Sequence, residues 1–331
     1  MRFTPEILRK HAQVLVDKEV KKTRGIRAAY LRGSLLYGSP LLGGAGDIDL
    51  VFIHNSPPVN NNQIIKLTPE IHFDIEHHDE ILYRKTREVR LDPWLGPTIY
   101  DAQPIYDPRH FLDYTQAGAR SNFNFPENIQ ARSKPLVKEA RQFWMDRQIS
   151  APREILIEFP AFLKALHNAV NAIALLSGPP LPTRRLALEF PARAAAVGAP
   201  GLALAFNHLL GSVSLTHDQL KSWLDEWEKT IDFLSVPGGS TPPLVEKKIY
   251  YQAAMVSNLK SEKPQDMLWP LINTWTEAIS LLPENNKFQL AWIKALTTLG
   301  FAGKDYMVRL EALDNFLEVC ETLIIGETAE S

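Results

Sequence analysis

The sequence IRAAYLRGSLLYGSPLLGGAGDIDLVFI, residues 26–53, contains two strands around which the first third of the chain is expected to fold. Residues 26–31 are mostly apolar and predict one strand, and residues 47–53 predict a second. The segment that joins them is rich in glycine, which predicts a loop whose backbone takes conformations closed to other residues. The sequence therefore indicates two strands connected by a wide loop.

Carboxylates follow this loop and recur on the next predicted strand, residues 70–77. Side chains two positions apart on a strand point to the same face, so Asp47 and Asp49 are expected side by side. Asp74 lies on the polar face of the alternating later strand. Carboxylates this close repel each other unless a cation lies between them, and Mg²⁺ prefers such oxygen ligands. We expect the three acids to bind two Mg²⁺ ions about 4 Å apart, the arrangement used for in-line phosphoryl displacement.

Gly33 and Ser34 lie where the first predicted strand enters the loop. A glycine at this point lets backbone N–H groups approach a polyphosphate, and the serine hydroxyl is a further donor. The segment has neither the Gly-Lys-Ser/Thr of a Walker loop nor the Gly-x-Gly-x-x-Gly of a dinucleotide-binding turn. It is therefore a different kind of candidate phosphate-binding loop.

The residues around these acids have more than one interpretation. The two acids of residues 47–49 could also be solvated at a strand end and bind no ion. Arg32 either contacts phosphates or forms an ion pair at the surface. Glu76 shares a strand face with Asp74 and could replace it or act as a base, or it could be an outer carboxylate. Three histidines lack the His-x-x-x-His spacing of a helical metal site and are expected at the surface or behind the ligands: His72, His77 and His78.

From about residue 126 onward the apolar residues recur with helical spacing, and no segment predicts a strand. Glycine and proline separate eight candidate helices, at residues 127–148, 153–176, 185–197, 216–234, 244–260, 266–281, 286–299 and 305–325. The expected fold is an α+β N-terminal domain with a mixed sheet and flanking helices, residues 1–115. An all-α helical-bundle domain, residues 126–331, follows it.

Some polar residues of the helical part are candidates for substrate binding. Arg184 and Arg185 follow a proline-rich loop and either bind triphosphate charge through bidentate hydrogen bonds or lie at the surface. Glu154 and Glu158 are candidate bases that would activate an acceptor. A polar stripe at helical spacing is expected to be a solvated face, with contact to an acceptor or base as the alternative: Lys164, His167, Asn168 and Asn171.

The composition argues against several classes of protein. The 36 Lys and Arg residues against 38 Asp and Glu residues give a formal net charge of −2, unlike a broad polycation on nucleic acid. The single cysteine, Cys320, excludes a disulfide framework and a Cys-based zinc site, so we expect a cytoplasmic protein. Residues 1–22 lack the apolar segment of a signal peptide, and we expect no membrane span or membrane partner.

The Gly33-Ser34 pair, the spacer of about a dozen residues, Asp47-Ile48-Asp49 and the later Asp74 together resemble the polymerase-β-type nucleotidyltransferase superfamily. The order of an α+β domain and a helical domain is similar to the aminoglycoside nucleotidyltransferases. The resemblance implies that Gly33 and Ser34 bind the β- and γ-phosphates of a nucleoside triphosphate. It also implies that Asp47 and Asp49 bind the metals and that Asp74 is a third carboxylate, a ligand or the general base.

Two positions depart from that family pattern. Gly46 stands where relatives commonly carry Ser or Thr just before the first acid, and no arginine lies near Tyr37, where relatives often have one. These differences concern the triphosphate pocket, whereas the metal-binding acids are all present.

The resemblance implies an enzyme that transfers a nucleoside monophosphate from a nucleoside triphosphate, with ATP as the expected donor, to an acceptor hydroxyl and releases pyrophosphate. A small molecule is the expected acceptor. An RNA or protein acceptor, as in the nucleotidyltransferase toxins of toxin–antitoxin pairs, is the alternative. A non-catalytic nucleotide-binding regulator is a further alternative of a different class.

Overall fold

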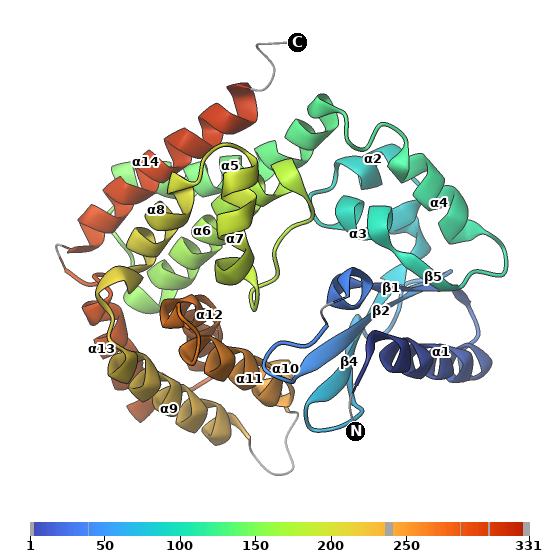
Figure 1. The fold of residues 1–331 in the computed structure, drawn as a ribbon, viewed down its shortest axis with the longest axis horizontal. Coiled ribbons are helices and arrows are strands. Elements are labelled where there is room, and N and C mark those ends of the chain that lie inside the picture. Colours follow the sequence, from blue (N-terminus) through green and yellow to red (C-terminus); the bar gives the residue numbers. More distant parts are fainter. Residues whose placement is uncertain (1–2, 39, 236–240, 285, 304, 327–331) are drawn as a thin grey trace. The chain divides into compact units, whose positions relative to one another are not determined.

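The computed structural model describes residues 3–38, 40–235, 241–284, 286–303 and 305–326. Contacts between Cα atoms divide the chain into two compact units, Met1–Asn128 and Ile129–Ser331. The first unit holds a five-stranded sheet with flanking helices, and the described part of the second consists of helices and their connections (Figure 1). The structure thus confirms the expected fold class, a mixed-sheet α+β region followed by an all-α region.

The sheet of the first unit has the strand order β3-β4-β2-β1-β5. The central strand β2 runs parallel to β4, and the other three neighbouring pairs are antiparallel. This arrangement makes β2 and β4, which are separated in the sequence, direct neighbours. The strands are β1 Ile26–Arg32, β2 Gly46–His54, β3 Asn62–Lys66, β4 Ile71–Asp79 and β5 Gln103–Tyr106.

Helix α1, Pro5–Lys22, packs on one face of this sheet. Thr4 begins the helix, since its Oγ1 accepts a hydrogen bond from the Ile7 backbone N at 3.4 Å, and proline occupies the first helical position. The apolar stripe of the helix recurs every four residues and faces the alternating apolar residues of β2. Their shared core contains Leu8, Ala12, Val16, Ile48, Leu50 and Phe52.

Short helices contribute to a second core on the opposite face of the sheet: α2 Thr86–Leu91, α3 Leu95–Asp101 and α4 Phe111–Arg120. This core includes Ala28, Tyr30, Val51, Ile53, Tyr83, Val89, Ile99 and Leu112. The central strand is therefore covered on both faces over residues 50–53, as its apolar composition indicates. Two 3₁₀ helices, η1 Gly33–Tyr37 and η2 Glu80–Tyr83, follow β1 and β4.

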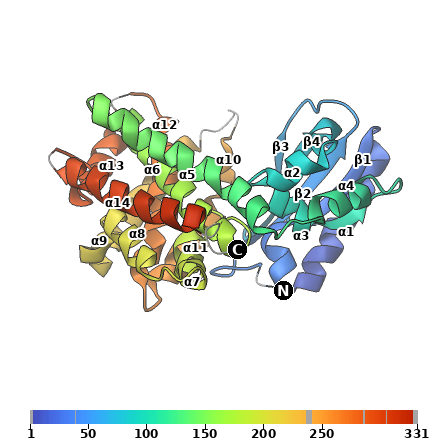
Figure 2. The same cartoon turned by 90° about the horizontal axis from the view of Figure 1, so that it is seen from above.

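The described helices of the second unit bury a large apolar core between them. Helices α5 and α14 lie side by side in both views (Figures 1 and 2), and Arg141 of α5 joins them by pairing with Asp314 and Glu321 of α14. The helices are α5 Pro126–Ile149, α6 Ile155–Ser177, α7 Leu186–Ala196, α8 Gly201–Leu210, α9 His217–Leu234, α10 Pro243–Glu246, α11 Lys248–Leu259, α12 Leu268–Ser280, α13 Lys287–Thr298 and α14 Asp305–Gly326. Two 3₁₀ helices, η3 Ser212–Ser214 and η4 Pro264–Met267, complete the unit.

Several elements differ from the sequence prediction in detail. Strand β3 and helices α3, α4 and α8 were not predicted. β3 is a partly exposed edge strand directly after a turn-rich segment, and the three helices are short, so none has a long periodic pattern. The predicted helix at 244–260 is divided into α10 and α11 by a break at Lys247.

Helix α6 is the one helix, within the ranges that the structure describes, that is long and apolar enough to cross a membrane. Its most apolar window is 72% buried inside the structure, and the core helix of a soluble protein passes the same test. The helix is therefore only weak evidence for a membrane span.

Candidate metal and nucleotide site

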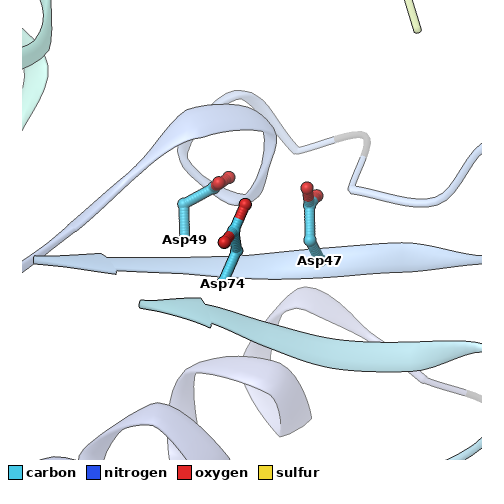
Figure 3. Close-up of side chains that lie close together, drawn as sticks. All are labelled: Asp47, Asp49 and Asp74. Atoms are coloured by element: carbon cyan, nitrogen blue, oxygen red, sulfur yellow. The ribbon is translucent and has the colours of Figure 1, made fainter. Parts of the chain in front are cut away.

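Three carboxylates meet on the face of the sheet opposite α1. Asp47 and Asp49 lie on β2, Asp74 lies on β4, and the parallel register places Asp49 directly beside Asp74. One oxygen from each carboxylate lies within 4.8 Å of the other two (Figure 3). The structure therefore brings together the three acids that strand alternation selects, at a spacing that fits shared cations.

Asp47 is the most deeply placed of the three acids, with 7% of its surface exposed. Among the described residues, none forms a hydrogen bond or an ion pair with its carboxylate. A largely buried carboxylate without a protein partner is unfavourable, since burial reduces the hydration of the charged group. The all-oxygen donor set and this unmet charge fit a divalent cation such as Mg²⁺.

Gly33 makes room for Asp49. Its φ of +75° lies in the left-handed region, and a Cβ atom at this position would lie 2.1 Å from the Asp49 Oδ2 atom. A side chain of any kind would therefore displace the carboxylate as well as strain the backbone. Gly33 thus determines where Asp49 lies, in addition to the phosphate contact implied for it by the resemblance.

Ser34 is the second residue of η1. Its Oγ atom is inaccessible to solvent and has no hydrogen-bond partner in the described part of the chain. Buried hydroxyl groups are normally satisfied, so an unsatisfied one makes Ser34 a candidate donor to a ligand. Ser34 directly follows Gly33, and Gly33 packs against Asp49 of the acid cluster. This position beside the cluster is consistent with a phosphate contact by Ser34.

Arg32 forms an ion pair with Glu76, one of the two roles that the sequence left open for it. Glu76 in turn accepts a hydrogen bond from His78 Nε2 at 3.0 Å. Burial alone would raise the pKa of Glu76, but His78 and Arg32 together hold it at about 2. Burial by itself would lower the pKa of Arg32, but the carboxylates of Asp49 and Glu76 raise it above its usual range. Both groups are therefore charged at neutral pH.

Gly46 begins β2, directly before Asp47. A Cβ atom here would lie 2.7 Å from the Pro40 carbonyl oxygen and 2.9 Å from Leu41 Cδ2. The segment at 40–41 thus packs where a Ser or Thr side chain would stand. The departure from the family pattern has a steric explanation, and it lies beside the first acid of the cluster.

The three histidines of β4 have different surroundings. His72 lies next to Asp47 in the register and is 4% exposed, whereas His78 binds Glu76. His77 hydrogen-bonds His54 at 2.9 Å, and burial lowers the pKa values of both rings. The acid triad is the only group of three or more metal-ligating side chains found among the described residues, and it includes no histidine.

The other candidate residues lie in the second unit. Arg184 is buried, its guanidinium lies 3.6 Å from the centre of the Tyr250 ring, and it donates to the Tyr250 carbonyl at 3.2 Å. Arg185 pairs with Glu189 at 3.3 Å. Their role as triphosphate ligands stays a prediction.

The polar stripe of α6 is not a solvated face, because its last two members are buried. Asn168 is 5% exposed and donates to Glu139, and Asn171 is fully buried and joins α6 to the backbone of Leu181. Burial alone lowers the pKa of His167 to about 4, and its ring stacks on Trp269. The stripe thus includes internal packing contacts of the helical unit.

The remaining candidates also have structural partners. Glu158 is buried, pairs with Arg147 at 3.3 Å and accepts a hydrogen bond from Tyr306 at 2.6 Å. Glu154 precedes α6 as its N-terminal flanking residue. Cys320 is fully buried in the helical core, as expected for a packing residue.

A comparison with models of protein families finds no match for this chain, and a comparison with curated proteins finds none either. The mixed sheet followed by helices, with its triad of aspartates, is compatible with a nucleotidyltransferase-like fold.

Proposed function

We propose that this protein is a metal-dependent nucleotidyltransferase. The observation that carries the proposal is the cluster of Asp47, Asp49 and Asp74, with ligand oxygens within 4.8 Å, beside the Gly33–Ser34 turn. Acids at this spacing serve phosphoryl displacement because they can hold cations that neutralise phosphate charge. The unpartnered Ser34 hydroxyl supports the proposal, since phosphate oxygens are acceptors for such a donor.

The residues of the site have distinct roles in this reaction. Mg²⁺ held by the three carboxylates would offset the charge of the phosphates and make the acceptor hydroxyl easier to deprotonate. Ser34 Oγ and the backbone N–H groups of η1 would donate to the β- and γ-phosphate oxygens. Asp47 and Asp49 would be ligands. Asp74 would be a ligand or would accept the proton of the attacking hydroxyl.

The reaction replaces one phosphoester linkage by another. The acceptor oxygen forms a bond to the α-phosphorus, and the bond from that phosphorus to the bridging α–β oxygen breaks, so that pyrophosphate leaves. The acceptor proton passes to a carboxylate or to solvent. We propose ATP as the donor, a hydroxylated small molecule as the acceptor and the cytoplasm as the location, in line with the family resemblance and the cysteine usage.

Isothermal titration calorimetry tests the metal and nucleotide part of this proposal. Wild-type protein is expected to bind ATP, with a non-hydrolysable α–β linkage, only when Mg²⁺ is present. Asp47→Asn and Asp49→Asn should lose the nucleotide binding that Mg²⁺ supports. The control Asp17→Asn, on the exposed side of α1, should bind as wild type does. Equal binding by wild type and both site variants would contradict the proposal.

The acceptor class needs a separate experiment. ATP labelled at the α-phosphorus is incubated with the protein, Mg²⁺ and, in parallel, hydroxylated small molecules, RNA or cell protein. Label on a small molecule supports the proposed acceptor. Label on RNA or protein supports the toxin-type alternative, and binding without transfer to any of them supports the regulator.

A further inference from the structure

We propose that Arg32 is a positioning residue: its side chain crosses β2, is held by the ion pair with Glu76, and keeps the Asp49 carboxylate in place for metal binding. We call this pair of residues the brace. The inference rests on the proposed metal site and adds two residues to it. It starts from the ion pair between Arg32 and Glu76, which connects strands that do not touch each other.

The strand register defines the path of this brace. Arg32 of β1 lies opposite Asp49 of β2, and Asp49 lies beside Asp74 of β4. Glu76 lies two residues beyond Asp74 on the same face of β4, beside Val51. The guanidinium must therefore pass over β2 on the far side of Asp49 from Asp47 to reach Glu76. It closes the acid cluster on that side.

The charges explain why a brace is useful here. Three metal-binding carboxylates and Glu76 share one face of two adjacent strands, so they repel one another when no cation is bound. Arg32 is paired across the strands with Asp49 and ion-paired with Glu76, so its charge attracts both. A planar guanidinium that is hydrogen-bonded to a fixed partner restricts where the neighbouring carboxylate can lie.

Glu76 has the support that an anchor needs. His78 Nε2 donates to it at 3.0 Å, and His78 Nδ1 is hydrogen-bonded to the Tyr83 hydroxyl. Tyr83 and Tyr30, both completely buried, are hydrogen-bonded at 3.0 Å. The chain of hydrogen bonds thus ends in the second core of the first unit, which fixes Glu76 and through it the guanidinium of Arg32.

Binding of Mn²⁺, measured without nucleotide from the electron paramagnetic resonance signal of the free ion, tests the brace. Arg32→Met is expected to weaken binding about tenfold or more, the effect usual for residues that orient metal ligands. Arg32→Lys, which keeps the charge but not the planar group, should fall between that variant and wild type. Arg84→Met is the matched control, since Arg84 is exposed, pairs with Glu80 at 2.7 Å in the same unit and should leave binding unchanged.

A double variant separates positioning from simple charge balance. Glu76→Gln removes the charge of the anchor and should weaken Mn²⁺ binding by itself. The double variant Arg32→Met/Glu76→Gln should bind about as weakly as Arg32→Met, because the two residues act as one unit. Wild-type affinity in the double variant, or equal or tighter binding in Arg32→Met, would overturn the proposal. If Arg32→Met does not fold, Glu76→Gln decides, and an unchanged affinity there overturns it.

The outcomes keep this inference separate from the proposed function. If Arg32→Met binds Mn²⁺ more weakly than wild type and the wild-type protein transfers no nucleotide, the brace is supported and the enzyme assignment is overturned. Wild-type protein that transfers nucleotides while Arg32→Met keeps its Mn²⁺ affinity would overturn the brace alone. In an active enzyme, Arg32→Met should raise the metal concentration needed for half-maximal activity, and saturating metal should restore part of kcat, which a merely structural residue would not do.

Discussion

The Asp49 carboxylate packs against Gly33 so closely that a Cβ atom on Gly33 would lie 2.1 Å from the Asp49 Oδ2 atom. Gly33, which follows β1 in a left-handed conformation, therefore also sets the position of Asp49 in the acid cluster. The glycine of the Gly-Ser pair thus makes room for the carboxylate, and the phosphate contact that we propose for it would be a second role.

Gly33→Ala is expected to move Asp49 and to weaken binding of Mg²⁺ or Mn²⁺ strongly. The left-handed conformation should add a loss of about 1 kcal/mol in the free energy of unfolding. Gly38→Ala is the matched control, because Gly38 has a φ of +81° but no atom within 4 Å of the added Cβ. It should lose similar stability without losing metal affinity. Equal metal affinities in the two variants would show that the contact with Asp49 does not matter.

Gly46→Ser, which introduces a residue type common in the nucleotidyltransferases that the sequence resembles, is expected to destabilise the protein. Its Cβ would meet the Pro40 carbonyl oxygen at 2.7 Å, so the segment at 40–41 must move or β2 must shift. We expect a loss of about 1–3 kcal/mol in chemical denaturation, the range found for overpacking. Gly201→Ala, where no atom lies within 4 Å, should be neutral or stabilising. A Gly46→Ser protein as stable as wild type would contradict the steric explanation.

His167 is expected to make the second unit sensitive to acid. Burial lowers its pKa from 6.5 in the unfolded chain to about 4, so the unfolded state binds the proton first as the pH falls. The stability that the neutral ring contributes is therefore complete above pH 6.5 and decreases between pH 6.5 and 4. The NMR signal of the ring should titrate near pH 4, and His167→Gln should reduce the slope of stability against pH in this window. A titration near pH 6.5 would disprove the burial effect.

Asp266 is expected to act in the opposite direction. It is 8% exposed, and burial raises its pKa from 3.8 to about 6, with Lys263 opposing the shift. The folded state therefore holds the proton more tightly, and its contribution is lost as the pH rises from 3.8 through 6. Asp266→Asn should thus be more stable than wild type at pH 7, by about 1–2 kcal/mol, and the difference should vanish near pH 4. A loss of stability at pH 7 would indicate a partner for the charged form.

Strand alternation was sufficient to select the acid triad. Asp47 and Asp49 share a face because they are two residues apart, and Asp74 lies on the polar side of an alternating strand. Their closeness also requires β2 and β4 to be adjacent, which the expected shared metal site assumed and which the structure shows, although β3 lies between them in the chain. The metal and nucleotide themselves stay predictions.

Other parts of the site depend on contacts that no local pattern encodes. Arg32 and Glu76 are 44 residues apart, and their pairing follows from the strand order rather than from either segment. The clash at Gly46 depends on how residues 40–41 fold back onto β2. Asn168 and Asn171 were expected in a solvated stripe because polar residues recur there at helical spacing. Their burial comes from packing partners elsewhere in the chain.

The destination of the two ends of the triphosphate tests the central claim most directly. The protein is incubated with Mg²⁺, a panel of hydroxylated acceptors and ATP labelled at either the α- or the γ-phosphorus. The account predicts that the α label moves to an acceptor and that the γ label leaves as pyrophosphate. With Asp47→Asn, neither label should leave ATP. Transfer of the γ label, its release as inorganic phosphate, or equal activity of Asp47→Asn and wild type would contradict it.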